Sequence, residues 1–200
     1  SLFTSGVGLI CSGSSTTIQA TITGGTSPFT VEIDNGLGIL TNYTVGTDIT
    51  VSPASTTTYN ITALTDANGC STSNFSTTAT VNVSQGPSAA LLSGSATICA
   101  GETTDLKVDL TGGTSPYTIE IDNGVGTINN YITGTDIPVS PLTTTTYSII
   151  SVLDANGCTG AGLNGTPTVT VNQVPDAAAT NPVICSGEQT NIEISNPNGV

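Results

Sequence analysis

The sequence predicts an all-β fold made of tandem antiparallel β-sandwiches. Residues 24–36 return at residues 112–124 with eleven of thirteen positions identical, and an internal copy at a fixed offset marks tandem units. Apolar and polar residues alternate along residues 29–33, which is the period of a half-buried strand. Turn signals such as Gly24–Gly25 and Asn35–Gly36 separate the alternating stretches, because these residues tolerate positive φ.

The elements of the first unit follow from the same alternation. No stretch has a convincing 3.6-residue period, so no helix is expected. About seven short strands in a unit of 88 residues are typical of an immunoglobulin-type sandwich, and a unit of this size can bury its own core. The expected strands are residues 7–10, 16–23, 29–33, 37–45, 49–51, 56–64 and 75–83.

The copy continues beyond the repeated stretch. At an offset of 88, Cys99 matches Cys11 and Tyr147 matches Tyr59. The sequence therefore predicts a first unit over residues 1–86 and a second unit over residues 87–174. Residues 175–200 contain the opening of a third, incomplete unit, with its first strand at Asn191–Ser195.

Composition excludes several classes of partner. The chain has 14 acidic residues, one basic residue (Lys107) and no His, giving a net charge of −13. Nucleic acids and anionic membrane surfaces attract Lys and Arg, so neither is an expected partner. No signal peptide and no apolar run of 18 residues is present, so we expect a mature or internal segment with no membrane insertion.

No catalytic residue is expected. Nucleophilic catalysis normally needs a base beside Ser, Cys or Thr, and the chain has no His and a single Lys. The glycine-rich turns are not followed by Gly-Lys-Ser/Thr, so they are not phosphate loops. Zinc is not expected either, because His and CxxC pairs are absent.

Calcium is the ion that the sequence could accommodate. The candidate ligands are Asp66 and Asn68, with their counterparts Asp154 and Asn156, because calcium prefers carboxylate and carbonyl oxygens. The remaining ligands of a calcium loop are missing. The alternative is a structural turn in which these side chains bond to local backbone, and on that interpretation the chain needs no cofactor.

The five cysteines allow two pairing schemes. Cys11–Cys70 and Cys99–Cys158 both span 59 residues, which predicts one disulfide within each unit and leaves the partner of Cys185 outside the chain. The rival scheme joins Cys70 to Cys99 and Cys158 to Cys185 across units. Either scheme requires an oxidising compartment, and so predicts an extracellular location.

Three further side-chain types have alternative interpretations. Tyr59 and Tyr147 match either a tyrosine corner, whose hydroxyl bonds nearby backbone, or ordinary core residues. Tyr43 and Tyr131 could form a sugar-binding platform if they are exposed. Lys107 is expected to be solvated rather than to form an isopeptide crosslink, because it lies between Leu106 and Val108 on the polar side of a strand.

The motifs together resemble a known family. Their order is Ile-Cys-x-Gly, Gly-Gly-Thr-x-Pro-Tyr/Phe, Val-x-Pro, Thr-Thr-Thr-Tyr, Asp-x-x-Gly-Cys and Val-x-Val. This order resembles the PKD-like, immunoglobulin-like tandem repeats of large Bacteroidota cell-surface proteins, including gliding-motility adhesins and other type IX-secreted proteins. The Trp that usually follows the Pro-Tyr strand is absent, and Glu32 and Glu120 lie there instead.

The resemblance implies a non-catalytic, extracellular role at the cell surface. We expect an elongated, disulfide-stabilised stalk or filament whose partners are neighbouring repeats or other copies of the chain. In one variant, strand Asn191–Ser195 is donated to the next copy. A carbohydrate- or calcium-dependent binding module, with surface glycans as partners, is the alternative from a different functional class, and an accessory repeat of a secreted enzyme is a third.

Overall fold

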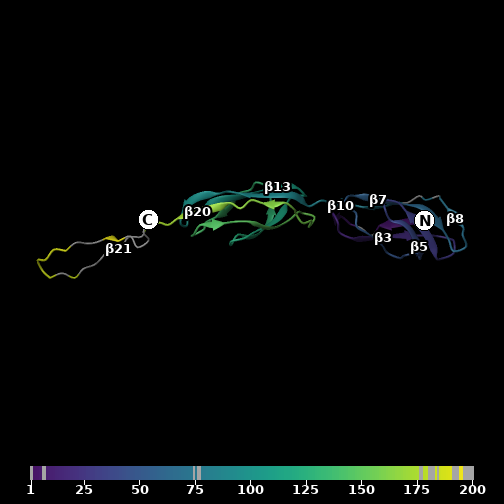
Figure 1. Cartoon of the computed structure of the whole chain (residues 1–200), viewed down its shortest axis with the longest axis horizontal. Coiled ribbons are helices and arrows are strands. Elements are labelled where there is room, and N and C mark those ends of the chain that lie inside the picture. The colour runs from purple at the N-terminus through teal and green to yellow at the C-terminus, as the bar shows by residue number, and fades with distance from the viewer. Residues whose placement is uncertain are drawn as a thin grey trace.

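The computed structural model confirms the all-β prediction. It describes residues 2–5, 8–73, 75, 78–175, 178–179, 183, 185–190 and 194–195, and every regular element among them is a strand. Figure 1 shows the first and second units one after the other along the long axis of the molecule. The domain limits at residues 86 and 174 stay predictions.

The strands of the first unit form two larger sheets and one short pair. Strand β3 lies between β1 and β6, β4 lies between β5 and β7, and β10 runs parallel to β2. The bounds are β1 Leu2–Ser5, β2 Ile10–Cys11, β3 Thr16–Thr21, β4 Phe29–Ile33, β5 Gly38–Tyr43, β6 Ile49–Val51, β7 Thr57–Thr65, β8 Ser71–Thr72, β9 Thr78–Val81 and β10 Val83–Ser84.

The second unit repeats this arrangement. Strand β14 lies between β15 and β18, β13 lies between β11 and β16, and β12 runs parallel to β20. The bounds are β11 Pro87–Ser93, β12 Ala96–Cys99, β13 Thr104–Gly112, β14 Tyr117–Ile121, β15 Gly126–Tyr131, β16 Ile137–Val139, β17 Thr145–Thr146, β18 Ile149–Leu153, β19 Leu163–Asn164 and β20 Thr168–Asn172.

The expected strands lie close to their predicted positions, except at the two ends of the first unit. The single strand predicted at residues 75–83 is divided into β9, which pairs with β7, and β10, which pairs with β2. The structure has strands at Leu2–Ser5 and Ile10–Cys11 rather than at residues 7–10, and Val7 lies outside the described residues. The tight turn at Asn35–Gly36 is confirmed, with φ of 52° and 88°. Both signs are positive, so Asn and Gly are the residues that fit there at least steric cost.

Each unit has its own hydrophobic core. The alternation on β4 places Phe29, Val31 and Ile33 inside the first core, with Thr30 and Glu32 exposed. The second core is built in the same way around Ile119 and Ile121. Tyr59 and Tyr147 lie in these cores, with 4% and 3% of their surface exposed.

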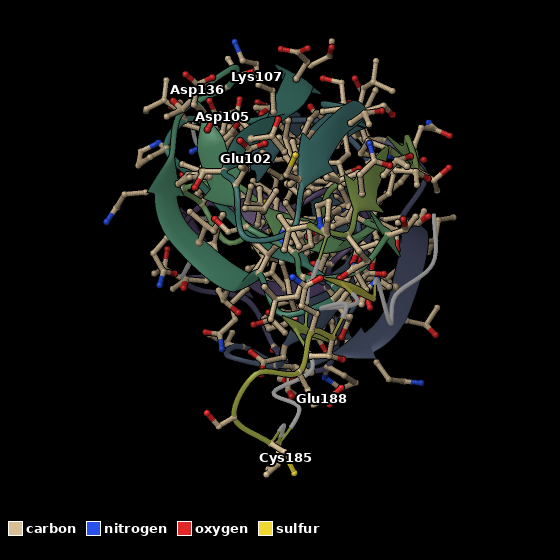
Figure 2. The ribbon with its side chains drawn as sticks, turned by 90° about the vertical axis from the view of Figure 1, so that its left-hand side faces the viewer. Glu102, Asp105, Lys107, Asp136, Cys185 and Glu188 are labelled. Atoms are coloured by element: carbon tan, nitrogen blue, oxygen red, sulfur yellow. A yellow bond between two sulfur atoms is a disulfide. The ribbon has the colours of Figure 1, made fainter. Side chains whose placement is uncertain are left out.

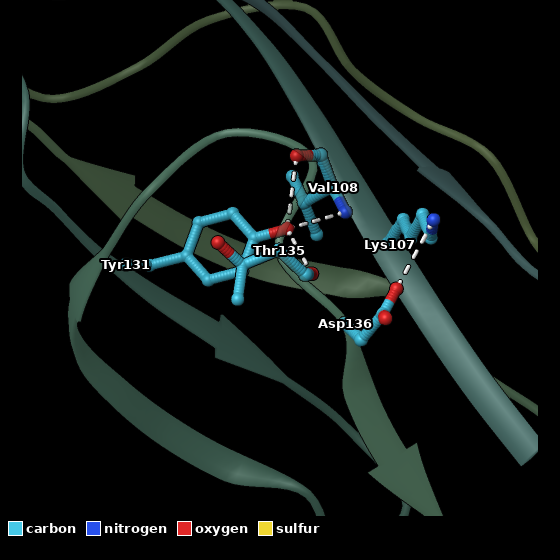
Figure 3. Close-up of polar contacts among 5 residues, drawn as sticks. All are labelled: Lys107, Val108, Tyr131, Thr135 and Asp136. Carbon is cyan, nitrogen blue, oxygen red and sulfur yellow. Dashed lines mark hydrogen bonds and ion pairs between the residues drawn. The ribbon is translucent and has the colours of Figure 1, made fainter.

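The hydroxyl that ties a loop to a strand belongs to a different pair of tyrosines. Tyr131 Oη accepts a hydrogen bond from Val108 N and donates to backbone carbonyls of Val108 and Thr135, at 2.8–3.1 Å (Figure 3). Tyr43 bonds Ala20 and Thr47 in the same way. Tyr43 and Tyr131 are only 5% and 3% exposed, so the prediction that they could form a sugar-binding platform is wrong.

Beyond the second unit the structure describes two short strands. Strand β21 (Ala178–Ala179) pairs antiparallel with β22 (Ile194–Ser195). Of the strand predicted at Asn191–Ser195, Ile194 and Ser195 form β22, and residues 191–193 lie outside the described residues.

Candidate functional site at the junction of the two units

Two elements meet where the first unit joins the second. One is the turn 154–158 of the second unit. The Asp154 carboxylate, 5% exposed, accepts hydrogen bonds from the backbone N–H groups of Thr114, Asn156 and Cys158 at 2.9–3.0 Å. A carboxylate that accepts three backbone N–H groups fixes the turn, so the sulfur of Cys158 is held in a defined position.

The other element is the short strand β2 of the first unit. It runs parallel to β10, with Cys11 opposite Ser84. Ser12 N donates to Ser84 O at 2.9 Å, and Ser14 N donates to Cys11 O at 2.9 Å. Cys11 therefore lies beside the last strand of the first unit, where the chain passes into the second.

A disulfide joins the two elements. Cys11 and Cys158 are bonded, with their Cα atoms 5.3 Å apart, a distance typical of bridged cysteines. This finding corrects both predicted schemes for these residues: Cys11 is not paired with Cys70, Cys158 is not paired with Cys99 or Cys185, and all three of those remaining cysteines are free and exposed. Figure 2 shows Cys185 on a loop well away from Lys107 and Asp136.

The physical reason is the position of the two cysteines within a unit. Cys11 lies beside Ser84, at the end where the chain leaves the first unit. Cys70 lies in the turn that is bonded to Thr26 through Asp66 and Ala67. The equivalent turn of the second unit, around Cys158, is the part that contacts the first unit. The two cysteines of one unit therefore face opposite junctions.

Close packing supports the disulfide. Asn156 Nδ2 donates to Ser84 Oγ across the junction at 2.9 Å. A Cβ at Gly86 would lie 2.2 Å from the carbonyl oxygen of Thr159, so a side chain does not fit here without a backbone shift. Ala161 N donates to Pro87 O at 2.8 Å, which holds the start of β11. An open groove of about 610 Å³ runs along this junction.

The candidate calcium ligands form hydrogen bonds within their own turns. Asp66 accepts the backbone N–H groups of Cys70, Thr26 and Asn68 at 2.9–3.0 Å, and these bonds, that of Cys70 first, lower the pKa of its carboxyl from its ordinary value. Asn68 Nδ2 donates to Thr26 Oγ1 at 2.8 Å. Within the described ranges, no group of three His, Cys, Asp or Glu side chains is arranged to hold a metal ion.

Lys107 is solvated, as expected. Its Nζ lies 3.1 Å from Asp136 Oδ1, and the two side chains are 51% and 59% exposed (Figure 3). Exposed pairs of this kind contribute little to stability. In the first unit, Gln19 Nε2 donates to Asp48 Oδ1 at 2.6 Å in the equivalent place, so the lysine replaces one polar contact by another.

Another hollow lies on the second unit. It has a volume of about 500 Å³ and is lined by Tyr147, Asn123 and mostly aliphatic or small side chains. Over the residues whose placement is described, no helix is long and apolar enough to span a membrane. At the junction, the disulfide and the hydrogen bond from Asn156 to Ser84 hold the two units together.

Sequence reasoning missed Ser84, Gly86 and Thr159, which form the contact surface beside the disulfide. One signal was present in the sequence. Gly86 corresponds to Val174 at the offset of 88, so the glycine is not a general feature of the linker.

Comparisons with known proteins give limited likenesses. No family model matches the sequence, and no match is found among curated proteins. Among solved structures, the chain is similar to fibronectin(III)-like modules of Clostridium thermocellum CbhA, with 15% identity over 82% of this chain and 89% of that chain and a TM-score of 0.37. It is also similar to the BSP domain of a biofilm associated protein, with 17% identity over 84% of this chain and 29% of that chain and a TM-score of 0.29.

Proposed function

We propose that this chain is a non-catalytic structural segment of an extracellular cell-surface adhesin or filament. In this role the repeated units act as rigid spacers that hold a binding surface away from the cell, or that associate to form a fibre. The partners are neighbouring repeats and other copies of the chain. No step of the proposal requires a cofactor.

The observation that carries the proposal is the disulfide between Cys11 and Cys158. A disulfide within one domain stabilises that domain alone. A disulfide between consecutive units instead fixes their relative position and transmits tension from one unit to the next without passing through the linker at residues 85–86. Such a bond has a clear use in a stalk under load, and it requires the oxidising environment outside the cell.

Two further features agree with a spacer. The units lie end to end in Figure 1, so the chain reaches farther than it would with the two units packed side by side. The chain has a single basic residue, which leaves almost no site for trypsin-like proteases. Its net charge of −13 also opposes non-specific association with acidic surfaces.

The test is the location and shape of the native protein. Antibodies raised against the second unit are applied to intact, unpermeabilised cells and followed by immunogold electron microscopy. The proposal expects gold on thin surface rods or fibres. Gold confined to permeabilised cells, or to compact particles shed from the surface, would overturn it.

Solution scattering tests the rigid-spacer mechanism separately. The oxidised chain is expected to scatter as an extended particle with a narrow distribution of shapes. The double variant Cys11→Ser/Cys158→Ser is expected to give a broader distribution, because the linker then sets the angle between units. Identical profiles would mean that the non-covalent contacts alone fix the junction.

A further inference from the structure

The second unit presents Cys99 in the setting that Cys11 has in the first. Strand β12 runs parallel to β20, with Cys99 opposite Asn172, just as Cys11 lies opposite Ser84. Ala100 N donates to Asn172 O at 2.9 Å, which reproduces the bond from Ser12 N to Ser84 O. Cys99 is nevertheless a free, exposed thiol.

The linker that leaves the second unit is anchored like the linker that leaves the first. Gln173 Nε2 donates to the carbonyl of Leu142 at 3.0 Å, and Gln85 Nε2 donates to the carbonyl of Ala54 at 2.6 Å. Two residues before each of these glutamines, the backbone N–H group donates a hydrogen bond of 3.0 Å to a threonine hydroxyl. The linker after the second unit is therefore held in the same way as the linker after the first unit, which leads into a docked unit.

The first unit presents the complementary half at its opposite end. Asp66 organises the turn around Cys70 with the same three acceptor contacts that Asp154 makes around Cys158. Cys158 is 2% exposed beside the first unit, whereas Cys70 is exposed. The two turns have the same internal bonds, so the difference in exposure lies in what is docked against them.

From these equivalences we propose that Cys99 forms a disulfide with the Asp-x-x-Gly-Cys turn of the next repeat of this kind, and that Cys70 forms the same bond with the strand cysteine of the repeat before it. The occupant is a further repeat, because residues 184–187 after the second unit repeat the Ile-Cys-x-Gly motif of residues 10–13 and 98–101. The inference rests on the proposed tandem array. Its direct support is the observed bond between Cys11 and Cys158, formed by the equivalent residues at the one complete junction.

The reaction is an oxidation of two thiols. Each new S–S bond releases two protons and two electrons, and a protein dithiol–disulfide oxidant of the extracytoplasmic space accepts them by thiol–disulfide exchange. The second junction differs from the first at several positions, among them Val174 in place of Gly86 and Asn172 in place of Ser84. The carbonyl that approaches Gly86 must therefore lie farther from Val174, and the angle between units is expected to differ.

The first experiment maps the disulfides of the native protein. Free thiols are blocked with N-ethylmaleimide before denaturation, and the protein is digested with pepsin at low pH, where exchange is suppressed. Mass spectrometry is expected to find the Cys99 peptide linked to an Asp-x-x-Gly-Cys peptide. Cys99 or Cys70 carrying N-ethylmaleimide in the native protein would overturn the inference.

The second experiment builds the junction. A copy of residues 87–174 is joined after Val174 of the chain, oxidised, and mapped in the same way. The expected new bond joins Cys99 to the copy of Cys158, and Cys99→Ser should leave that copied cysteine free while Cys70→Ser should not. A bond from Cys99 to any other cysteine would refute the proposal. Surface labelling is read out independently, so failure of this pairing and failure of the proposed function are distinguishable.

Discussion

Removing the sulfur of Cys11 tests the junction most sharply, because the disulfide couples the stabilities of both units. When the first unit unfolds in the oxidised chain, the bond to Cys158 still closes an unfolded segment of roughly 76 residues, from position 11 to position 86. When the second unit unfolds, a similar segment is closed. The chain-entropy model gives about 4 kcal/mol for loops of this size, and measured values are typically about 2–4 kcal/mol.

We therefore expect Cys11→Ser to destabilise both units by about 2–4 kcal/mol each, with melting temperatures lower by roughly 10–30 °C. Cys158→Ser should do the same. Calorimetry measures the transitions, and hydrogen exchange of β7 and β18 followed by mass spectrometry assigns them to the first and second unit. The double variant Cys11→Ser/Cys158→Ser has no unpaired thiol at the junction that could undergo thiol–disulfide exchange. Its melting temperatures should match those of the single variants.

The controls are Cys70→Ser and Cys99→Ser, which change exposed free thiols and should leave both transitions where they are. The reasoning would be refuted if each cysteine variant lowered the melting transition of its own unit alone. If Cys11→Ser and Cys70→Ser lowered only the first transition while Cys158→Ser and Cys99→Ser lowered only the second, the disulfides would lie within the units.

The remaining predictions concern the tyrosines and the aspartate turns. Tyr131→Phe removes the hydroxyl that bonds Val108 and Thr135, and we expect a loss of about 1–3 kcal/mol in the second unit by denaturant titration; a loss in the first unit instead would contradict the assignment. Burial raises the pKa of Tyr43 and Tyr131 above the ordinary value of 10.0. Because the folded-state pKa is raised, the contribution of these tyrosines to stability is fully present below about pH 10 and is lost as the pH rises through the folded-state pKa. Ultraviolet absorbance should therefore show tyrosine ionisation that coincides with alkaline unfolding. Ionisation of these tyrosines well before unfolding would count against this prediction. Millimolar calcium should leave the melting temperature unchanged, because the carboxylate oxygens of Asp66 already accept backbone N–H groups; a calcium-dependent rise would instead support the binding-module alternative.

Local pattern accounts for the parts of the fold that were predicted correctly. The alternation on Phe29–Ile33 identifies a strand and its buried face, since that information lies within five residues. The turn at Asn35–Gly36 follows from the conformational freedom of two residues. The internal copy extends each of these conclusions to the second unit, because the same local sequence meets the same surroundings.

The tyrosine error shows where local pattern stops. Tyr43 lies on β5, a strand whose other residues are exposed or half-buried. The preceding Asn42 has φ of 58°, and the pairing of β4 with β5 shifts register between Phe29 and Val31. An irregularity of this kind turns the following side chain toward the core, and no period-2 count anticipates it.

The sequence by itself determined the all-β class, the internal copy, most of the strands and the turns that punctuate them, because these depend on neighbours along the chain. Only the tertiary structure decided which cysteines meet. Equal spacings of 59 residues fit one bond per unit as well as any other regular scheme, and spacing does not report at which end of a sandwich a side chain emerges. Cys11 and Cys158 are brought together by the folding of each unit and by the docking of one on the other.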